Sequence, residues 1–398
     1  MQKEKILIIA TTFPRWENDK IPNFVYELSR EYTKKYDVHV LAPHSKGSKA
    51  YENMEDIKVH RFRYFFPKFE NLSQGISISN AIERNKLNIF LIPFFLFSGL
   101  CKLLYLLIKY PFKIIHNHWL IPFSPFSAFF KPLFKYRLIV TSHGGDILGF
   151  SKGIKRYIIK KISEYAITKS DYYTVVSKEI KTVAEENFDI DFNNKLKVIS
   201  MGIPYDDFQK VKPNFSKDSF TAVFVGRLSE MKGTEYLIRA IGELKKQGEK
   251  IKCKIIGDGP KREYLESLVK ELNIEDQVQF TGFIPHSQLT EALNRTSVFV
   301  GPSITTSTGY KEGFGLVFIE AMAAGLPVIA SRSGGITDTV KHKETGLLVE
   351  EKGYKQIAEY IKEIRDNESL RNELIKGGKQ TAKQYSWQNI GERFMELF

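Results

Sequence analysis

Residues 312–320, with the sequence EGFGLVFIE, combine the residue types that bind a phosphorylated ligand. Gly313 and Gly315 free the backbone for a sharp turn, and strong helix formers follow from Leu316. The first amides of such a helix form an anion site that can hold a diphosphate with little help from side chains. Gly313, Phe314, Gly315 and Leu316 are therefore predicted to bind phosphate.

Two carboxylates flank this turn, Glu312 before the helix and Glu320 within it. Eight residues at 1.5 Å of rise separate them by up to about 12 Å. The acid and the nucleophile of a retaining double displacement lie only about 5 to 5.5 Å apart, so this pair does not fit that role. The spacing instead favours a grip on the two ends of an elongated ligand, with each carboxylate accepting hydrogen bonds from hydroxyl groups. A helix with an incidental N-terminal glutamate is the alternative.

Two cations lie near another expected strand end. The apolar run at residues 221–225 predicts a strand, Arg227 follows its end, and Lys232 precedes the next expected helix. Ligands of parallel α/β sheets bind at the carboxyl ends of the strands, where both cations would lie. Arg227 offers a fork for phosphate oxygens and Lys232 a point charge, as a departing diphosphate requires. A solvated surface pair explains the positions equally well.

Metal and redox chemistry fit the sequence less well. His116 and His118 lie at the end of an expected strand with no carboxylate close by in sequence, which favours a packed or substrate-facing role over metal binding. The two cysteines, Cys101 and Cys253, have no ligand-spaced His or Cys beside them. The sequence therefore predicts neither a disulfide framework nor a zinc site, and a reducing, cytoplasmic setting follows as the default.

Length and composition are those of an ordered globular protein. The 398 residues are 42% hydrophobic and 26% charged, which excludes a disordered or collagen-like chain. At about 100 to 200 residues per domain, this length suggests two or three domains. The turn after the first expected strand has no glycine and the chain has no GxxxxGK[ST] motif, which excludes the common dinucleotide and phosphate-loop signatures.

Two series of expected strands, each alternating with helical segments, must position these groups. The first series comprises residues 5–10, 38–42, 113–116, 138–142 and 172–176. The second comprises residues 221–225, 253–256, 278–281, 298–302 and 327–330. Such alternation indicates parallel sheets. We therefore predict an α/β protein of two Rossmann-like, doubly wound domains, residues 1–203 and 204–382, that face each other across a cleft.

Four motifs carry a family resemblance. They are HGGD at 143–146, VGRLSEMKG at 225–233, GDGP at 257–260 and EGFGLVFIEAMAAGLPVIAS at 312–331. Together they resemble the retaining glycosyltransferases of family 4, the glycosyl transferases group 1, which have the GT-B fold. The resemblance covers nearly the whole chain and is densest from about residue 222 to 349.

The resemblance implies a role for each matching residue of the second domain. Arg227 and Lys232 match residues that bind the donor diphosphate. Glu312 matches a residue that contacts the donor sugar, and Glu320 one that contacts the nucleotide ribose, which agrees with the two-ended grip inferred above. The predicted donor-binding residues are thus Arg227, Lys232, Gly313, Phe314, Gly315, Leu316 and Glu320.

The resemblance also implies roles in the first domain. His143 matches a residue beside the donor sugar and the reaction centre, and Asp146 matches its acidic companion. His143 and Glu312 are therefore the predicted catalytic residues, and Asp146 and His118 are predicted on the acceptor side.

The resulting prediction is a retaining hexosyltransferase that uses a UDP- or GDP-sugar and a hydroxyl of a glycan or lipid-linked acceptor, in cell-envelope polysaccharide or glycolipid synthesis. No metal, other cofactor or nucleic acid is expected. A helix at about 383–398 is expected to pack back on the first domain. Two alternatives stay open, a sugar phosphorylase or sucrose-synthase-like enzyme of the same fold, and a basic membrane-binding scaffold without activity.

The net charge of +13 lies almost entirely in the first half, because residues 1–200 carry 31 Lys/Arg against 19 Asp/Glu and residues 201–398 carry 28 against 27. This asymmetry predicts an anionic partner. Residues 101–170 combine 12 Lys/Arg and two acids with 13 aromatic residues, and residues 151–168 can form an amphipathic helix. Both features favour an acidic membrane surface at the inner face of the cell membrane, with a solvated basic face as the alternative.

One apolar stretch, residues 87–108, approaches the length of a membrane span, with Lys102 as its only charge. A span there would place strands of one sheet on opposite sides of a bilayer. We therefore predict a buried helix packed on the sheet, with a segment lying in the membrane interface as the alternative.

Overall fold

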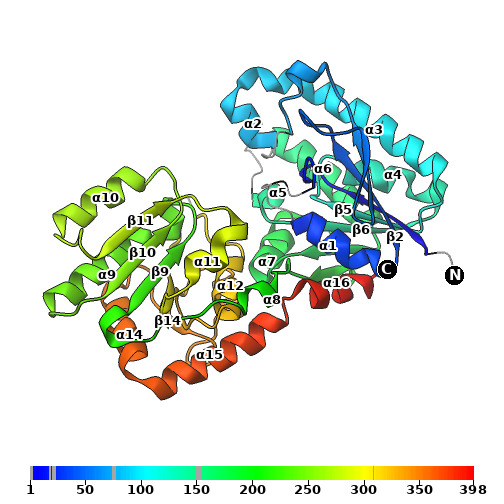
Figure 1. The fold of residues 1–398 in the computed structure, drawn as a ribbon. Coiled ribbons are helices and arrows are strands. Elements are labelled where there is room, and N and C mark those ends of the chain that lie inside the picture. Colours follow the sequence, from blue (N-terminus) through cyan, green and yellow to red (C-terminus); the bar gives the residue numbers. More distant parts are fainter. Residues whose placement is uncertain (1–2, 18, 20–23, 74–77, 149–153, 308) are drawn as a thin grey trace. The chain divides into compact units, whose positions relative to one another are not determined.

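The computed structural model describes residues 3–17, 19, 24–73, 78–148, 154–307 and 309–398. The chain divides into two compact units (Figure 1). The N-terminal unit comprises Met1–Ser200 together with Ile390–Phe398, and the C-terminal unit comprises Met201–Asn389. Each unit is built on one mainly parallel sheet covered by helices.

The sheet of the N-terminal unit has eight strands in the order β3-β4-β2-β1-β5-β6-β7-β8. The strands are β1 (Lys5–Ile9), β2 (Asp37–Pro43), β3 (Tyr51–Met54), β4 (Ile57–Phe62), β5 (Ile114–His118), β6 (Arg137–Ser142), β7 (Tyr172–Val175) and β8 (Leu196–Val198). Only the edge strand β3 is antiparallel to its neighbour. The apolar strand β1 lies between β2 and β5 and is almost fully buried, as its continuous apolar run predicts.

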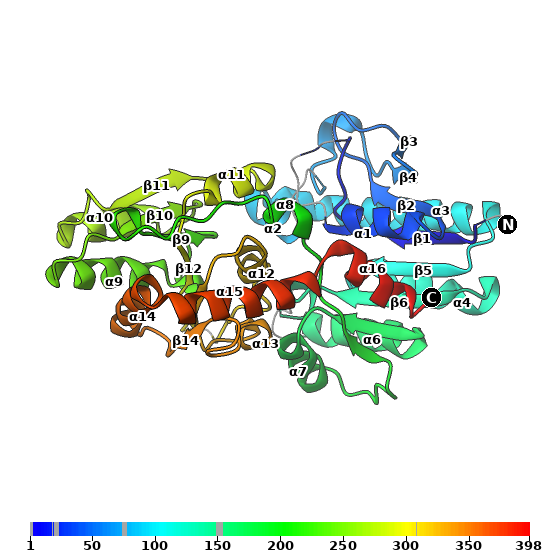
Figure 2. The same ribbon diagram turned by 60° about the horizontal axis from the view of Figure 1, so that its bottom comes forward.

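Helices cover both faces of this sheet. They are α1 (Phe24–Thr33), α2 (Ile78–Arg84), α3 (Ile92–Lys109), α4 (Ser124–Phe134), α5 (Gly145–Leu148), α6 (Ile154–Lys169), α7 (Lys178–Asn187) and α16 (Trp387–Met395), with short 3-10 turns η1 (Pro67–Phe69) and η2 (Lys86–Leu91). Neighbouring residues of β5 show the two faces. His116 contacts Tyr32 of α1 and Phe394 of α16, which lie side by side in Figure 2, whereas Asn117 bonds to Ser127 of α4.

The sheet of the C-terminal unit has six parallel strands in the order β11-β10-β9-β12-β13-β14. They are β9 (Thr221–Val225), β10 (Lys252–Ile256), β11 (Val278–Gly282), β12 (Val298–Gly301), β13 (Val328–Ser331) and β14 (Leu347–Val349). The helices and turns are α8 (Tyr205–Phe208), η3 (Lys217–Ser219), η4 (Glu230–Lys232), α9 (Thr234–Lys246), α10 (Arg262–Glu271), η5 (His286–Gln288), α11 (Leu289–Leu293), α12 (Leu316–Ala323), α13 (Ile336–Thr339), α14 (Tyr354–Asp366) and α15 (Glu368–Lys383). The chain order reverses between β9 and β12, and ligands of such sheets bind at this switch point.

The two series of expected strands are present, and the prediction of two Rossmann-like α/β domains is confirmed. Four further strands, β3, β4, β8 and β14, are not predicted from the sequence. The sequence does not predict strand β4, because this strand carries polar residues at positions that are usually apolar in a buried strand. Its Arg61 is buried and is held by Glu52 of β3 and by the carbonyl oxygen of Pro14.

The prediction of a buried helix at 87–108 is wrong in part. The segment forms η2 and α3, and only 33% of an apolar window of 18 residues within it is buried. Phe95, Gly99 and Leu103 pack on the sheet, whereas the opposite side of α3 is exposed. By length and composition, this one helix among the described residues could cross a membrane.

The predicted amphipathic helix at 151–168 corresponds to α6. Residues 151–153 and the side chains of Ile154, Lys155 and Arg156 lie outside the described part of the chain. The apolar residues Ile158, Ile162 and Tyr165 are exposed, and Lys160 is paired with Asp189 at 2.7 Å.

Candidate active site

The loops that follow β9 and β12 are tied together at the switch point of the C-terminal sheet. The amide of Ile304, after β12, donates to the carbonyl oxygen of Met231 at 2.8 Å. Gly233 has a φ of +60°, and a Cβ atom there would lie 1.9 Å from the carbonyl oxygen of Pro302. A glycine is therefore required where the two loops meet. This contact fixes the backbone on which Lys232 is carried.

The turn into α12 has the form that the sequence predicts. Gly315 has a φ of +78°, and a Cβ atom there would lie 2.6 Å from the Phe318 ring. The helix begins at Leu316, and no side chain among the described residues caps it. Its first amides can therefore donate hydrogen bonds to an anion. The amide of Gly335 donates to the carbonyl oxygen of Glu312 at 2.9 Å and holds the start of the turn.

Lys232 and Glu312, which lie 80 residues apart in sequence, form an ion pair. Glu312 is buried and Lys232 is half-buried. The ion pair brings together, beside the turn into α12, a residue predicted to bind the diphosphate and a residue predicted to bind the sugar. A diphosphate arriving there would share the ammonium group with Glu312, so the site supplies a positive charge that is partly shielded from solvent and held in place.

Glu320 and Arg227 complete the set in the C-terminal unit. Glu320 is buried on α12 and its carboxylate is 2.8 Å from the ring Nε2 of His286, in η5. The His286 ring is 57% exposed, so a ligand that bonds to Glu320 can also reach it. Arg227 is exposed in the loop after β9, and none of the described residues pairs with its guanidinium. His286 is not predicted from the sequence, because no local motif links it to Glu320.

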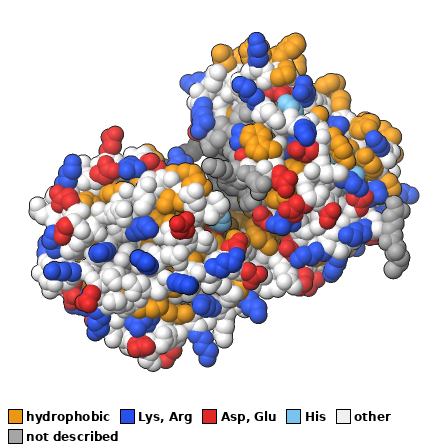
Figure 3. Space-filling view, in the orientation of Figure 1, with side chains coloured by type: hydrophobic (Ala, Val, Ile, Leu, Met, Phe, Trp, Pro, Cys, Tyr) orange, Lys and Arg blue, Asp and Glu red, His pale blue; other side chains and the backbone are white. Residues whose placement is uncertain are grey.

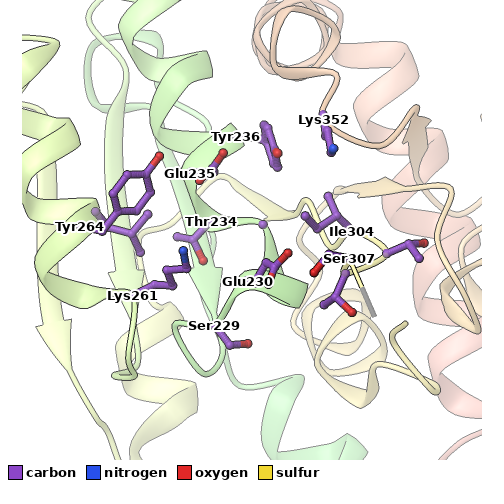
Figure 4. A pocket seen from close by; sticks show the side chains of 14 residues that line it. Ser229, Glu230, Thr234, Glu235, Tyr236, Lys261, Tyr264, Ile304, Ser307 and Lys352 are labelled. Carbon is purple, nitrogen blue, oxygen red and sulfur yellow. The ribbon is translucent and has the colours of Figure 1, made fainter. Parts of the chain in front are cut away.

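A cavity of about 330 Å³ lies beside the loop that carries Lys232 (Figure 4). Ser229 and Glu230 line it together with Lys261 from the turn before α10. None of the predicted donor-binding residues lines this cavity, so it is a neighbour of the predicted diphosphate site and is not that site.

In the N-terminal unit, the carboxyl ends of β5 and β6 bring His118 and His143 together. Nδ1 of His118 is 3.1 Å from Nε2 of His143, and the two rings are stacked. Phe24, at the start of α1, and Trp119 contact the His143 ring at centroid distances of 4.8 and 5.0 Å. The aromatic contacts and the hydrogen bond fix the orientation of His143. The role of Phe24 is not predicted from the sequence.

The carboxylate of Asp146 binds backbone amides around His143. One carboxylate oxygen accepts from the amide of His143 at 3.1 Å, and the other accepts from the amide of Leu120 at 2.8 Å. Asp146 therefore ties the loop after β6 to the loop after β5. Burial raises the pKa of this carboxyl above its ordinary value.

The three histidines at this sheet edge are neutral at physiological pH. Burial lowers the pKa of His143 to about 3 and the pKa of His116 to about 3, and it lowers the pKa of His118 well below 6.5. A neutral His143 can donate one hydrogen bond and accept another. Among the described residues, no group of three or more His, Cys, Asp or Glu side chains is placed to hold a metal ion.

Acidification should destabilise the N-terminal unit, beginning below about pH 6.5. His39, His60 and His116 are buried, and burial lowers their pKa values to about 4, about 3 and about 3. The unfolded chain protonates each ring near its ordinary pKa while the folded chain does not, so each ring removes about 1.4 kcal/mol per pH unit from the free energy of unfolding as the pH falls toward the folded pKa. Calorimetry at about pH 7 and about pH 5 measures this loss.

The double variant His39→Asn, His60→Asn should reduce the pH dependence of the free energy of unfolding. His342→Asn changes a half-buried ring of the C-terminal unit and should alter this pH dependence less than the double variant does. A melting temperature that is constant over this range would contradict the prediction.

Comparisons with known proteins identify the family to which the chain belongs. A family model described as "Glycosyl transferases group 1" matches residues 206–381, and one described as "Glycosyltransferase Family 4" matches residues 21–207. An uncharacterized glycosyltransferase of Methanocaldococcus jannaschii is 33% identical over 276 residues, which are 69% of this chain and 72% of that protein. A GDP-mannose-dependent alpha-(1-6)-phosphatidylinositol monomannoside mannosyltransferase of Mycobacterium tuberculosis is 31% identical over 179 residues, 44% of this chain and 46% of that protein.

The fold also matches a solved structure, that of Anabaena HepE in complex with UDP. The TM-score is 0.69 at 18% identity, with 99% of this chain and 98% of that chain covered. The chain therefore belongs to the glycosyltransferases of GT-B fold, and the prediction is confirmed at that level.

Proposed function

We propose that this protein is a retaining hexosyltransferase that moves a hexose from a UDP- or GDP-sugar to a hydroxyl of a glycan or lipid-linked acceptor, without a metal or other cofactor. The observation that carries the proposal is the ion pair of Lys232 with Glu312 at the turn into α12, beside uncapped helix amides. This arrangement offers one cation and several amides to a diphosphate, and a carboxylate to the attached sugar.

The proposed reaction is a displacement on one face of the sugar. The acceptor oxygen forms a bond to the anomeric carbon as the bond from that carbon to the diphosphate oxygen breaks, and the hydroxyl proton passes to the leaving diphosphate. Both events occur on the same face, so the configuration is retained. Arg227, Lys232 and the amides near Gly315 stabilise the charge on the leaving group. Glu312 accepts hydrogen bonds from the sugar and Glu320 from the ribose.

We assign His143 to the reaction centre, where its neutral ring donates a hydrogen bond to a sugar hydroxyl. His118 acts through His143 as a positioning residue, because its Nδ1 bonds to that ring. Asp146 has a positioning role as well, through the two amides that it binds. The names of relatives support the choice of substrates, since the mycobacterial enzyme is named as a GDP-mannose-dependent phosphatidylinositol monomannoside mannosyltransferase and HepE was solved with UDP.

The substitution Glu320→Gln should weaken nucleotide binding about 10- to 100-fold, because it removes a charged hydrogen-bond acceptor from the ribose. A thermal-shift panel of UDP, GDP, ADP and their sugars first identifies the nucleotide, since a ligand that binds only the folded state raises the melting temperature. Titration calorimetry with that nucleotide then compares the variant with the parent and with Glu263→Gln, an exposed carboxylate on α10.

An unchanged nucleotide affinity in Glu320→Gln would show that Glu320 does not bind the ribose. The retaining course is tested separately, by the anomeric configuration of the product in NMR, and an inverted product would contradict it. Turnover of a glycan with inorganic phosphate in place of a nucleotide would favour the phosphorylase alternative.

A further inference from the structure

The outer side of α3 carries a row of apolar side chains that none of the described residues covers. The residues recur at intervals of three or four, so they lie along one side of the helix and of the η2 turn that leads into it. This row, called here the apolar stripe, comprises Phe90, Phe94, Phe97, Cys101, Tyr105 and Ile108. Phe90, Phe97 and Ile108 are the most exposed, at 71%, 69% and 72%.

The opposite side of α3 is fixed in the core of the unit. The ring of Phe95 packs 5.1 Å from that of Phe62 in β4. A Cβ atom on Gly99 would lie 2.4 Å from the Phe123 ring, which shows how closely the helix backbone approaches the residue before α4. The helix cannot leave this packing to cross a bilayer without opening the sheet layer. Only contact in the plane of a surface is available to it.

Aromatic residues of the preceding loop extend the stripe. The Phe65 ring lies 5.1 Å from Phe94 and 5.3 Å from Phe66. Phe66 and Phe69 are themselves exposed. Figure 3 shows the hydrophobic side chains gathered along the edge of the N-terminal unit where α3 lies. A contiguous exposed patch of this kind marks an interaction surface.

The charge around the apolar stripe indicates which kind of surface it contacts. From residue 84 to residue 145 the chain has eight Lys/Arg and no Asp or Glu. Lys86 and Lys109 flank the stripe at its two ends and are exposed, and Lys102 lies beside its middle. Aromatic and aliphatic side chains beside lysines, without carboxylates, match the headgroup boundary of a bilayer that contains anionic lipids.

A second copy of this chain fits the surface less well. A symmetric contact through the stripe would bring the same lysines of two copies together, and the segment from 84 to 145 offers no carboxylate to pair with them. The apolar area would be covered, but the like charges would repel.

We propose that the protein docks on membranes containing anionic lipid through the apolar stripe, with α3 lying in the plane of the interface. The docking is a property of the N-terminal unit that goes beyond the transfer reaction. It does not depend on the donor chemistry, and Lys232→Ala should therefore bind vesicles as the parent does.

The two cysteines allow a direct test, because Cys101 is exposed on the stripe whereas Cys253 is buried in the C-terminal unit. Cys101 of the full chain is labelled with an environment-sensitive fluorophore. Vesicles of phosphatidylcholine mixed with phosphatidylglycerol should shift the emission to the blue, and phosphatidylcholine alone should do so much less. High salt should weaken the shift.

Substitutions provide matched variants for vesicle co-sedimentation. Phe97→Gln should lower the vesicle affinity about tenfold, because an aromatic ring no longer enters the interface. Phe283→Gln, which changes a ring that is 76% exposed in the C-terminal unit, should leave it unchanged. Lys109→Glu should lower the affinity about tenfold through charge alone.

Three results would overturn the proposal. One is vesicle binding without any change in the emission of the label, which would place the contact elsewhere. Another is an emission shift that depends on protein concentration without vesicles, which would identify a second copy as the occupant of the stripe. Failure of all vesicle binding would equally reject it and would leave the nucleotide-binding experiments untouched.

Discussion

Replacing Lys232 with alanine should lower kcat/KM about 10²- to 10³-fold, the range seen when one preorganised donor to a developing negative charge is removed. The ammonium group is held at the turn into α12 by Glu312 and is half-buried, so solvent screens it less than it screens a fully exposed lysine. The charge on the leaving diphosphate grows as its bond to the sugar breaks. The loss should therefore appear mainly in kcat, with a smaller loss in the affinity for the free nucleoside diphosphate.

The same substitution leaves Glu312 buried without its cation, which adds repulsion toward the diphosphate. The double variant Lys232→Ala, Glu312→Gln should therefore bind the nucleoside diphosphate more tightly than Lys232→Ala does. Lys246→Ala, on an exposed lysine at the end of α9, is the matched control and should keep the parental kcat/KM. A Lys232→Ala enzyme with the kinetic constants of that control would reject the diphosphate role.

The substitution Gly233→Ala should destabilise the C-terminal unit by about 2 to 5 kcal/mol, adding the cost of a left-handed residue to that of a steric clash. The φ of Gly233 is +60°, and the new Cβ atom would meet the carbonyl oxygen of Pro302 at 1.9 Å. Because the obstacle is backbone, no side-chain rotation can relieve it. The loops after β9 and β12 must then separate, which displaces Lys232 and weakens donor binding as well.

Gly248→Ala separates the two costs. Gly248 lies just past the other end of α9 and has a φ of +80°, and a Cβ atom there would meet no described atom within 4 Å. It should therefore show the conformational cost alone, about 1 kcal/mol. Urea unfolding of both variants measures the difference, and equal destabilisation would show that the loops adapt to the clash at no cost.

Local patterns predicted much of the fold for clear reasons. The strand β9 and the start of α12 are found where the sequence places them, because a short apolar run and the pair Gly313 and Gly315 constrain the backbone locally. The strand β4 was missed because His60 and Arg61 make a buried strand look polar. Burial of such residues depends on partners that come from other segments.

The sequence by itself determined which groups could bind a diphosphate, where most strands and helices form, and that the positive charge lies in the first half of the chain. Only the tertiary structure decided that Lys232 pairs with Glu312, that His286 bonds to Glu320, and that His118 orients His143. These pairs join residues 25 to 80 positions apart. They depend on which strands become neighbours in a sheet, and periodicity does not encode strand order.

The same limit applies to α3. Its sequence is apolar on nearly every side, so periodicity cannot show which side packs on the sheet. Burial of Phe95 and Gly99 by β4 and by Phe123 leaves the opposite side without cover among the described residues. A helix is half covered or fully covered according to how many layers pack around it, and only the folded chain fixes that number.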